Sequence, residues 1–269
     1  MKTLYNKYKA LGSLLILCLL LSSCEKEVDV NLHSVEPRIV IEGIIKQDQP
    51  ATVRVSQTID FNNNEGYPNL SGAVVTISDE QGNSEVLQQD SSGWYTAANL
   101  KGEIGHTYHL SVTYQGQAYT ATSQMPPRVP LDSITIKKVS AIDNPFPVLH
   151  FLDPLGETNQ YYRALVIING KQRPDVQEFV ETAEFSDGIH IGWPLMVFSN
   201  DSDIKPIEKG DELTIELQAI DKATYKFFAS LISIGQSPTN PISNISNGAL
   251  GYFSACATDR KTIIADWED

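Results

Sequence analysis

The sequence is poor in cysteine, with three in 269 residues, and their positions exclude a disulfide framework. Cys18 lies in an apolar N-terminal segment, Cys24 directly follows that segment, and Cys256 stands alone in the rest of the chain. If the segment is removed and Cys24 is modified, no intramolecular disulfide can form. The fold must then be held by its apolar cores, which a chain of this length can build. Cys256 lies in the apolar run 250–257, so we expect a buried, unreactive thiol there.

Long apolar runs are also missing. The best candidate, residues 11–21, includes Gly12 and Ser13 and is far shorter than the roughly 20 apolar residues that a membrane-spanning helix needs. This excludes a transmembrane anchor at the N-terminus. A short apolar core after a basic start is instead typical of an export signal.

Basic residues are few, with 20 Lys and Arg against 33 Asp and Glu. Removal of residues 1–23 would leave 17 basic and 33 acidic groups, a formal charge of −16. Such a surface repels phosphate backbones and anionic lipid headgroups. We therefore expect no nucleic-acid partner and no electrostatic docking on a membrane.

Motifs for catalysis or cofactor binding are absent from the sequence. The nearest approach to a serine nucleophile elbow, residues 235–239, reads Gly-Gln-Ser-Pro-Thr and lacks the second glycine. There is no phosphate-binding loop and no His-Glu-x-x-His motif. Carboxylate pairs for glycoside hydrolysis cannot be recognised among so many acidic residues. We expect a non-enzymatic protein with no catalytic residue and no cofactor.

Metal ligands at a recognisable spacing are also lacking. His106 and His109 lie three apart on a predicted strand, so their side chains should point to opposite faces and cannot share one metal ion. The oxygen-rich segments 60–66 and 201–203 suit either a calcium site or a solvated turn. The first does not match an EF-hand loop, because the twelfth position is Ser71. We expect no resident metal.

The sequence does contain one strong motif, close to its N-terminus. Residues 21–24 read Leu-Ser-Ser-Cys, after three lysines among the first nine residues and the apolar core. This pattern resembles the lipobox of bacterial lipoproteins, which implies that residues 1–23 are a removed signal peptide and that the thiol of Cys24 takes a diacylglycerol. Two or three acyl chains anchor a soluble domain stably, so Cys24 would be the membrane-inserted residue.

Residues 24–36 are charged and have no hydrophobic period, which predicts a lipidated tether. Acidic residues directly after the cysteine resemble the surface-export signal of lipoproteins of the Bacteroidetes; the alternative is a plain spacer. We expect an outer-membrane, lipid-anchored protein whose body faces the cell exterior.

The rest of the chain predicts an all-β protein of two tandem sandwich domains. Residues 37–125 alternate between short apolar segments and turn residues, as in an antiparallel sandwich. Their glycine-bounded strands at 72–77, 93–95 and 105–112 resemble the transthyretin-like or immunoglobulin-like class. Strands are expected at 39–45, 51–55, 73–77, 93–95, 107–114 and 117–122.

Residues 126–131 contain three prolines and predict a stiff linker before a second sandwich, residues 132–269. The second domain includes one helix near 222–234, which Asp221 caps and Gly235 ends. Strands are expected at 132–136, 147–152, 161–168, 176–185, 195–199, 213–219 and 250–257.

Two aromatic residues are candidates for contact with a ligand or partner. Tyr67 lies in the long loop of the first domain, and Trp193 lies before Pro194 in the second. Each ring could stack on a glycan or contact a peptide, or it could simply pack against the protein.

Together these features resemble a family of Bacteroidetes outer-membrane lipoproteins, domain of unknown function four-two-four-nine. The resemblance implies a companion of a TonB-dependent outer-membrane transporter, with no established activity and no catalytic residue. The alternative is a stand-alone surface protein for glycan binding or adhesion. The residues that carry the resemblance are Cys24-Glu25-Lys26-Glu27, Glu36-Pro37, Val40-Ile41-Glu42-Gly43, Gly72-Ala73-Val74, Pro126-Pro127, Asp132-Ser133-Ile134, Asp153-Pro154, Tyr161-Tyr162-Arg163 and the run from Asn247 to Ala255.

Lipidation can be tested by metabolic labelling. Radiolabelled palmitate should enter the wild-type chain and be absent from Cys24→Ala, because the thiol is the acceptor. Cys256→Ala is the matched control and should label like the wild type. Equal labelling of wild type and Cys24→Ala would contradict the lipobox assignment.

Overall fold

The computed structural model describes most of the chain after the predicted tether. The signal peptide, Cys24 and all but the last residue of the tether lie outside the described residues. In the described part, no helix has both the length and the apolar character needed to cross a bilayer. The described ranges are 36–60, 66–139, 142–156, 160–173, 179–184, 186–196, 205–233 and 240–268.

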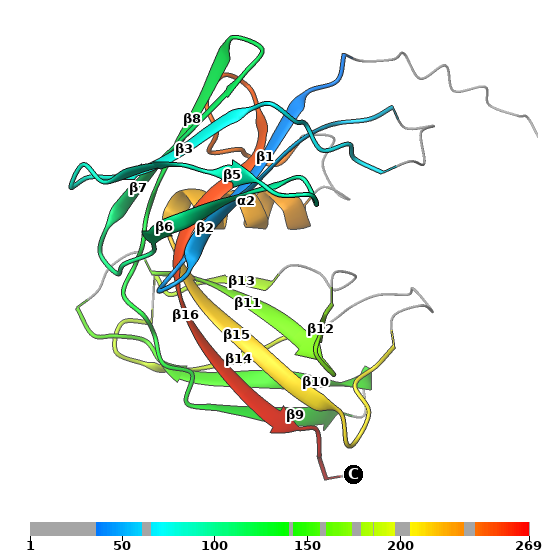
Figure 1. The fold of residues 1–269 in the computed structure, drawn as a ribbon. Coiled ribbons are helices and arrows are strands. Elements are labelled where there is room, and N and C mark those ends of the chain that lie inside the picture. Colours follow the sequence, from blue (N-terminus) through cyan, green and yellow to red (C-terminus); the bar gives the residue numbers. More distant parts are fainter. Residues whose placement is uncertain are drawn as a thin grey trace, which may run out of the picture. The chain divides into compact units, whose positions relative to one another are not determined.

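One long sheet organises the described residues. Its strand order is β12-β11-β15-β16-β1-β2-β6-β5, and β13 also pairs with β11 (Figure 1). Neighbouring strands are antiparallel except for β1 and β16, which run parallel. The bounds are β1 Ile39–Lys46, β2 Pro50–Gln57, β5 Gln88–Gln89, β6 Trp94–Lys101, β11 Tyr161–Ile168, β12 Lys171–Gln172, β13 Phe179–Thr182, β15 Glu212–Ile220 and β16 Leu250–Ile264.

Two smaller sheets cover one face of the long sheet, which confirms the all-β sandwich class. The sheet β4-β3-β7-β8 and the strands it covers form the first lobe, and the sheet β14-β10-β9 and its counterpart strands form the second lobe. The bounds are β3 Val74–Asp79, β4 Ser84–Val86, β7 Thr107–Tyr114, β8 Gln117–Gln124, β9 Ser133–Val139, β10 Ile142–Leu152 and β14 His190–Pro194.

Period-two alternation explains which residues fill each core. Along β1, Ile41 and Ile45 are fully buried and point into the first lobe, opposite Leu110 and Val112 of β7. Successive side chains of a strand face opposite sides, so the even-numbered residues of β1 form part of the other face. We call this other side of the long sheet the outer face.

Strand β16 belongs to both lobes, which corrects the domain boundaries expected from the sequence. Its residues 250–256 pair with β1, and residues 257–264 pair with β15. The prediction placed all of 132–269 in a second sandwich, but Phe253 and Ala255 complete the core of the first. The proline linker therefore separates the small sheets and not the long one, and Glu36–Asp269 is one compact unit.

A glycine makes the close pairing of β1 and β16 possible. Gly251 stands opposite Ile41, and a Cβ at this position would overlap the backbone of Ile41. Its φ of +97° also lies in the region that side chains rarely adopt. Glycine is thus required where the first and last strands meet.

Helix α2, Lys222–Ile232, packs on the outer face, next to β11 and β16 (Figure 1). The carboxylate of Asp221 accepts a 2.7 Å hydrogen bond from the Thr224 amide, so the predicted helix and its cap are confirmed. Gly235, the expected stop, lies outside the described residues. The helix, expected within the second domain, covers the region where the two lobes join.

A small apolar cluster on the outer face contains Cys256, Tyr161 and Ile220. The thiol of Cys256 is fully buried, and this burial raises its pKa to about 12. A thiol with such a pKa carries almost no thiolate at neutral pH. The expected burial of Cys256 is confirmed.

One expected strand is wrong. The prediction placed a strand at 195–199, but its described residues 195 and 196 are not in a strand, and β14 comprises His190–Pro194 directly before them. Ile191 and Trp193 alternate with His190 and Gly192, a period-two pattern that pairs with β10. Residues 197–199 lie outside the described part of the chain.

A buried carboxylate joins three neighbouring central strands of the long sheet, β15, β16 and β1, on its outer face. Glu216 of β15 is fully buried and accepts hydrogen bonds from Lys46 of β1, at 2.6 Å, and from Arg260 of β16, at 2.5 Å. Gln218 adds a further bond of 2.6 Å. Burial alone would raise the pKa of Glu216, but the charge and hydrogen bond of Lys46, together with Gln218 and Arg260, hold it below its ordinary value.

This array should make stability depend on pH. Because the pKa of Glu216 is lower in the folded state, its contribution is present above the unfolded pKa and is lost as the pH falls through the folded pKa. We expect Glu216→Gln to lower the free energy of unfolding by about 2–3 kcal/mol at pH 7, less than for a fully buried pair because Lys46 and Arg260 reach water.

Urea unfolding at pH 7 and near pH 3 measures this effect, and the difference between variant and wild type should shrink at the lower pH. Glu212→Gln, at the exposed start of the same strand, is the control and should change stability by less than about 0.5 kcal/mol. Equal effects of the two substitutions would contradict a special role for Glu216.

Candidate functional site

The described residues contain no group of three or more His, Cys, Asp and Glu side chains placed to hold a metal ion. His106 lies 3.6 Å from carboxylate oxygens of both Glu80 and Glu103, whereas His109 contacts Thr122 at 3.0 Å. The two histidines therefore have separate surroundings, although His106 precedes β7 and only His109 lies in the strand. The candidate calcium segments fall largely or wholly outside the described residues, at 61–65 and 201–204.

Trp193, expected as a possible ligand contact, packs in the core of the second lobe. Its side chain is only 7% exposed and belongs to the same cluster as Leu149, its neighbour on β10. The indole is therefore not available to a glycan or a protein partner. Of the two alternatives for Trp193, packing against the protein holds, because the residue occupies an inward position of strand β14.

Tyr67 has the opposite environment. It is 60% exposed and lines a groove of about 410 Å³ between α2 and the outer face of β1 and β2. We call this the helix groove. Its apolar side is formed by Val40, Phe227, Leu231, Pro241 and Leu250, and its polar side includes Glu42, Arg54 and Ser56.

An ion pair forms the polar part of the helix groove. Glu42 and Arg54 stand opposite each other on β1 and β2, and Arg54 Nη1 lies 3.3 Å from Glu42 Oε2. Arg54 also donates to the side chain of Asn69, at 2.8 Å, and to the backbone carbonyl of Tyr67, at 3.2 Å. Arg54 therefore fixes the Tyr67 loop against the sheet as well as pairing with Glu42.

The ion pair belongs to a cross-strand row on the outer face. Tyr252 of β16 stands opposite Glu42, and Trp94 of β6 stands opposite Arg54. Residues directly opposite in neighbouring strands share a face, so the row reads Tyr252, Glu42, Arg54, Trp94 across four strands. Tyr252 packs against Phe227 of the helix, whereas Trp94 is 36% exposed. Sequence reasoning missed this row because pairing partners are not encoded in local pattern.

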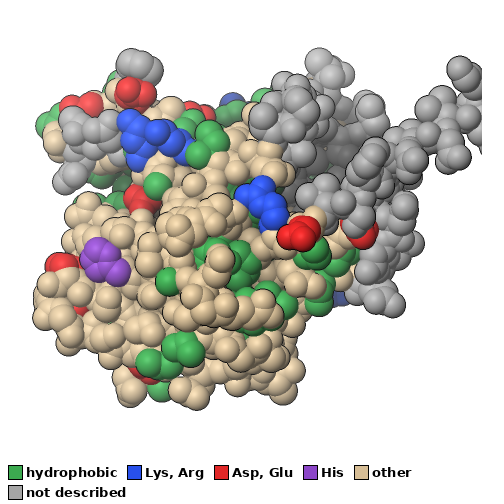
Figure 2. Space-filling view, turned by 90° about the horizontal axis from the view of Figure 1, so that it is seen from above, with side chains coloured by type: hydrophobic (Ala, Val, Ile, Leu, Met, Phe, Trp, Pro, Cys, Tyr) green, Lys and Arg blue, Asp and Glu red, His purple; other side chains and the backbone are tan. Residues whose placement is uncertain are grey.

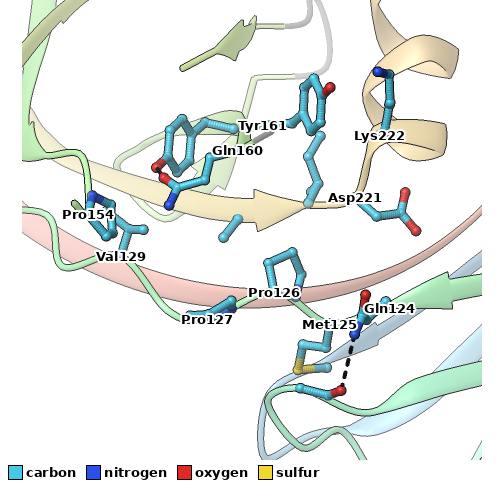
Figure 3. A pocket seen from close by; sticks show the side chains of 14 residues that line it. Gln124, Met125, Pro126, Pro127, Val129, Pro154, Gln160, Tyr161, Asp221 and Lys222 are labelled. Atoms are coloured by element: carbon cyan, nitrogen blue, oxygen red, sulfur yellow. Dashed lines mark hydrogen bonds between the residues drawn. The ribbon is translucent and has the colours of Figure 1, made fainter. Parts of the chain in front are cut away.

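A second cavity, of about 460 Å³, lies between the two lobes, and we call it the interlobe cavity (Figure 3). Met125 and the linker residues Pro126 and Pro127 line the cavity, together with Tyr161 of the second lobe and Lys222 at the start of the helix. The Lys222 ammonium lies 6.0 Å from the centre of the Tyr161 ring. The cavity wall thus combines proline and tyrosine rings with aliphatic, amide and charged side chains.

The carboxylate of Asp221 is committed to structure inside the interlobe cavity. One oxygen caps α2 and the other accepts a 2.5 Å hydrogen bond from the hydroxyl of Ser123 in β8. The same hydroxyl accepts from the Ala255 amide of β16, at 2.8 Å. Both oxygens of Asp221 accept hydrogen bonds within the protein, so this residue joins the helix to the first lobe.

One buried acid near the interlobe cavity was not singled out from the sequence. Asp153 is 1% exposed and accepts a 2.7 Å hydrogen bond from the Tyr162 hydroxyl. Burial raises its pKa, against the lowering effect of the Tyr162 bond. Its second oxygen has no hydrogen-bond partner among the described residues. The Asp153-Pro154 turn was visible in the sequence, but burial of the acid was not.

Charge on the surface is mixed. On the face shown in Figure 2, acidic and basic side chains are scattered among hydrophobic and polar groups in the coloured part of the surface. A broad field of one sign, which would steer a highly charged ligand, does not form on that face among the described residues. Binding of a ligand on that face would therefore depend on the shape and side chains of the individual site.

The role of Asp221 can be tested by comparing two substitutions. Asp221→Ala removes the helix cap, at about 1 kcal/mol, and leaves the Ser123 hydroxyl without an acceptor, at about 1 kcal/mol more. Asp221→Asn keeps one acceptor oxygen, which can still cap the helix, and its NH2 group can donate to the Ser123 hydroxyl, so it should lose less stability than Asp221→Ala. Thermal or urea unfolding measures the difference, and equal losses would contradict the network.

Comparison with known proteins gives a family and no curated relative. The model of the family described as "Domain of unknown function (DUF4249)" matches residues 25–262, which include both lobes, the linker and α2. No curated protein matches the chain. The chain belongs to the DUF4249 family.

Proposed function

We propose that this chain is a non-enzymatic, lipid-anchored outer-membrane protein that acts as an accessory component of a TonB-dependent nutrient uptake system. The observation that carries the proposal is the Leu-Ser-Ser-Cys motif at residues 21–24, followed by a polar tether and a compact β unit from Glu36. The resemblance of the chain to Bacteroidetes lipoproteins supports the same role.

The length of the tether supports a role close to the membrane. Thirteen residues, 24–36, span at most about 45 Å when fully extended. A body attached through Cys24 would therefore remain beside other proteins of the same membrane, at a high effective concentration. Its strongly acidic composition would keep it soluble there and away from anionic lipid surfaces.

A second candidate is a stand-alone surface protein for glycan binding or adhesion. The observation that favours it is the exposed ring of Tyr67 on the helix groove. Such a protein would hold its ligand without a transporter. The two candidates differ in whether a membrane partner is obligatory.

The transporter partnership can be tested by affinity capture. Tagged full-length protein, purified from detergent-solubilised outer membrane of its own organism after mild cross-linking, should recover a TonB-dependent transporter identified by mass spectrometry. The Cys24→Ala chain, which lacks the anchor, should recover little of it. Recovery of abundant outer-membrane porins at the same level as any transporter would contradict the proposal, as would recovery of no transporter.

A further inference from the structure

We propose that the helix groove binds a neutral sugar ring, with Tyr67 as the stacking platform and the Glu42–Arg54 pair as the reader of its hydroxyl groups. The proposal names a ligand class for the chain, and it rests on the proposed function only for its setting at the cell surface. Of the two aromatic candidates from the sequence, Trp193 packs in the core, and the proposal gives a role to the exposed one, Tyr67.

The platform is an exposed ring on a fixed backbone. Tyr67 is 60% exposed, while its carbonyl accepts from Arg54 and the neighbouring Asn69 accepts from the same guanidinium. The amide of Asn69 in turn donates to Ser92, at 2.8 Å. An aromatic side chain on a braced loop loses little conformational freedom when a ligand covers it, which favours binding. The C–H face of a sugar ring matches such an apolar surface.

The wall opposite the loop is apolar and comes from other elements. Phe227 and Leu231 lie on the groove side of α2, and Leu250 begins β16. A ring seated in the groove would therefore contact apolar groups on more than one side. The volume of about 410 Å³ falls in the range of roughly 300–1,000 Å³ that is usual for small-molecule sites.

The polar groups favour a neutral ligand with many hydroxyls. Glu42 offers acceptors and Arg54 offers donors, and their side chains remain about a third exposed, at 37% and 27%. Because the two charges are paired, the groove carries no net charge from them to attract an anion or a cation. Hydroxyl groups can donate to the carboxylate and accept from the guanidinium at the same time, as a simple ion cannot.

The position of the groove argues against an extended peptide. It lies over β1 and β2, and each of these strands already has a hydrogen-bonded neighbour on both sides. No strand edge is therefore open in the groove floor for a peptide backbone to join. A compact ring ligand that uses side-chain contacts fits this surface better.

Neutral saccharides can be tested directly on the full chain purified in detergent. A glycan array of neutral and acidic sugars, followed by calorimetry with the best neutral ligand, should show binding by the wild type. Tyr67→Ala should weaken it by roughly tenfold or more, because stacking is lost, and Tyr67→Phe should remain within about twofold. Glu42→Gln should weaken binding while leaving Tyr67 in place.

Tyr114→Ala, in the β7–β8 hairpin away from the groove, is the matched control and should bind like the wild type. Thermal unfolding of each variant separates loss of binding from loss of fold. The proposal is overturned by absence of neutral-saccharide binding, by equal affinity of Tyr67→Ala and wild type, or by tighter binding of acidic sugars. None of these results depends on a transporter. Failure of the saccharide proposal is therefore distinguishable from failure of the transporter proposal in the capture experiment.

Discussion

The parallel pairing of β1 with β16 is the contact on which the rest of the described structure depends. It places the first described strand beside the last, and Gly251 permits the close approach to Ile41. Without it, β16 would pair only with β15, and the first lobe would lose Phe253 and Ala255 from its core. The continuous outer face that carries α2 and the helix groove exists because these two strands meet.

The charged network around Glu216 on the outer face also depends on the pairing of β1 with β16. Lys46 and Glu216 come from strands that belong to different lobes, and β16 between them supplies Arg260. A buried carboxylate is costly unless it is paired, so this array favours one arrangement of the lobes over others. Glu42 and Arg54 form a second ion pair between neighbouring strands of the outer face. This pair lies nearer to solvent, so its charges stay accessible.

Local pattern predicted most single elements and none of the long-range pairings. The expected strand at 161–168 agrees with β11. The hairpin that follows it turns at Asn169 and Gly170, whose φ values are positive, 49° and 76°. Alternation identifies a strand but does not identify its neighbour, so the sharing of β16 was not predictable. The same limit applies to the sites: exposure of Tyr67 was inferred from its loop, whereas burial of Trp193 depended on an unrecognised strand.

The pairing of β1 with β16 also dictates an order of events when the chain is made. About 200 residues separate the two strands, so during synthesis β1 emerges long before its parallel partner exists. Non-local contacts of this kind are slow to form, and the shared sheet cannot close until the last segment is released. The first lobe must therefore wait, incomplete and conformationally open, for the end of the polypeptide.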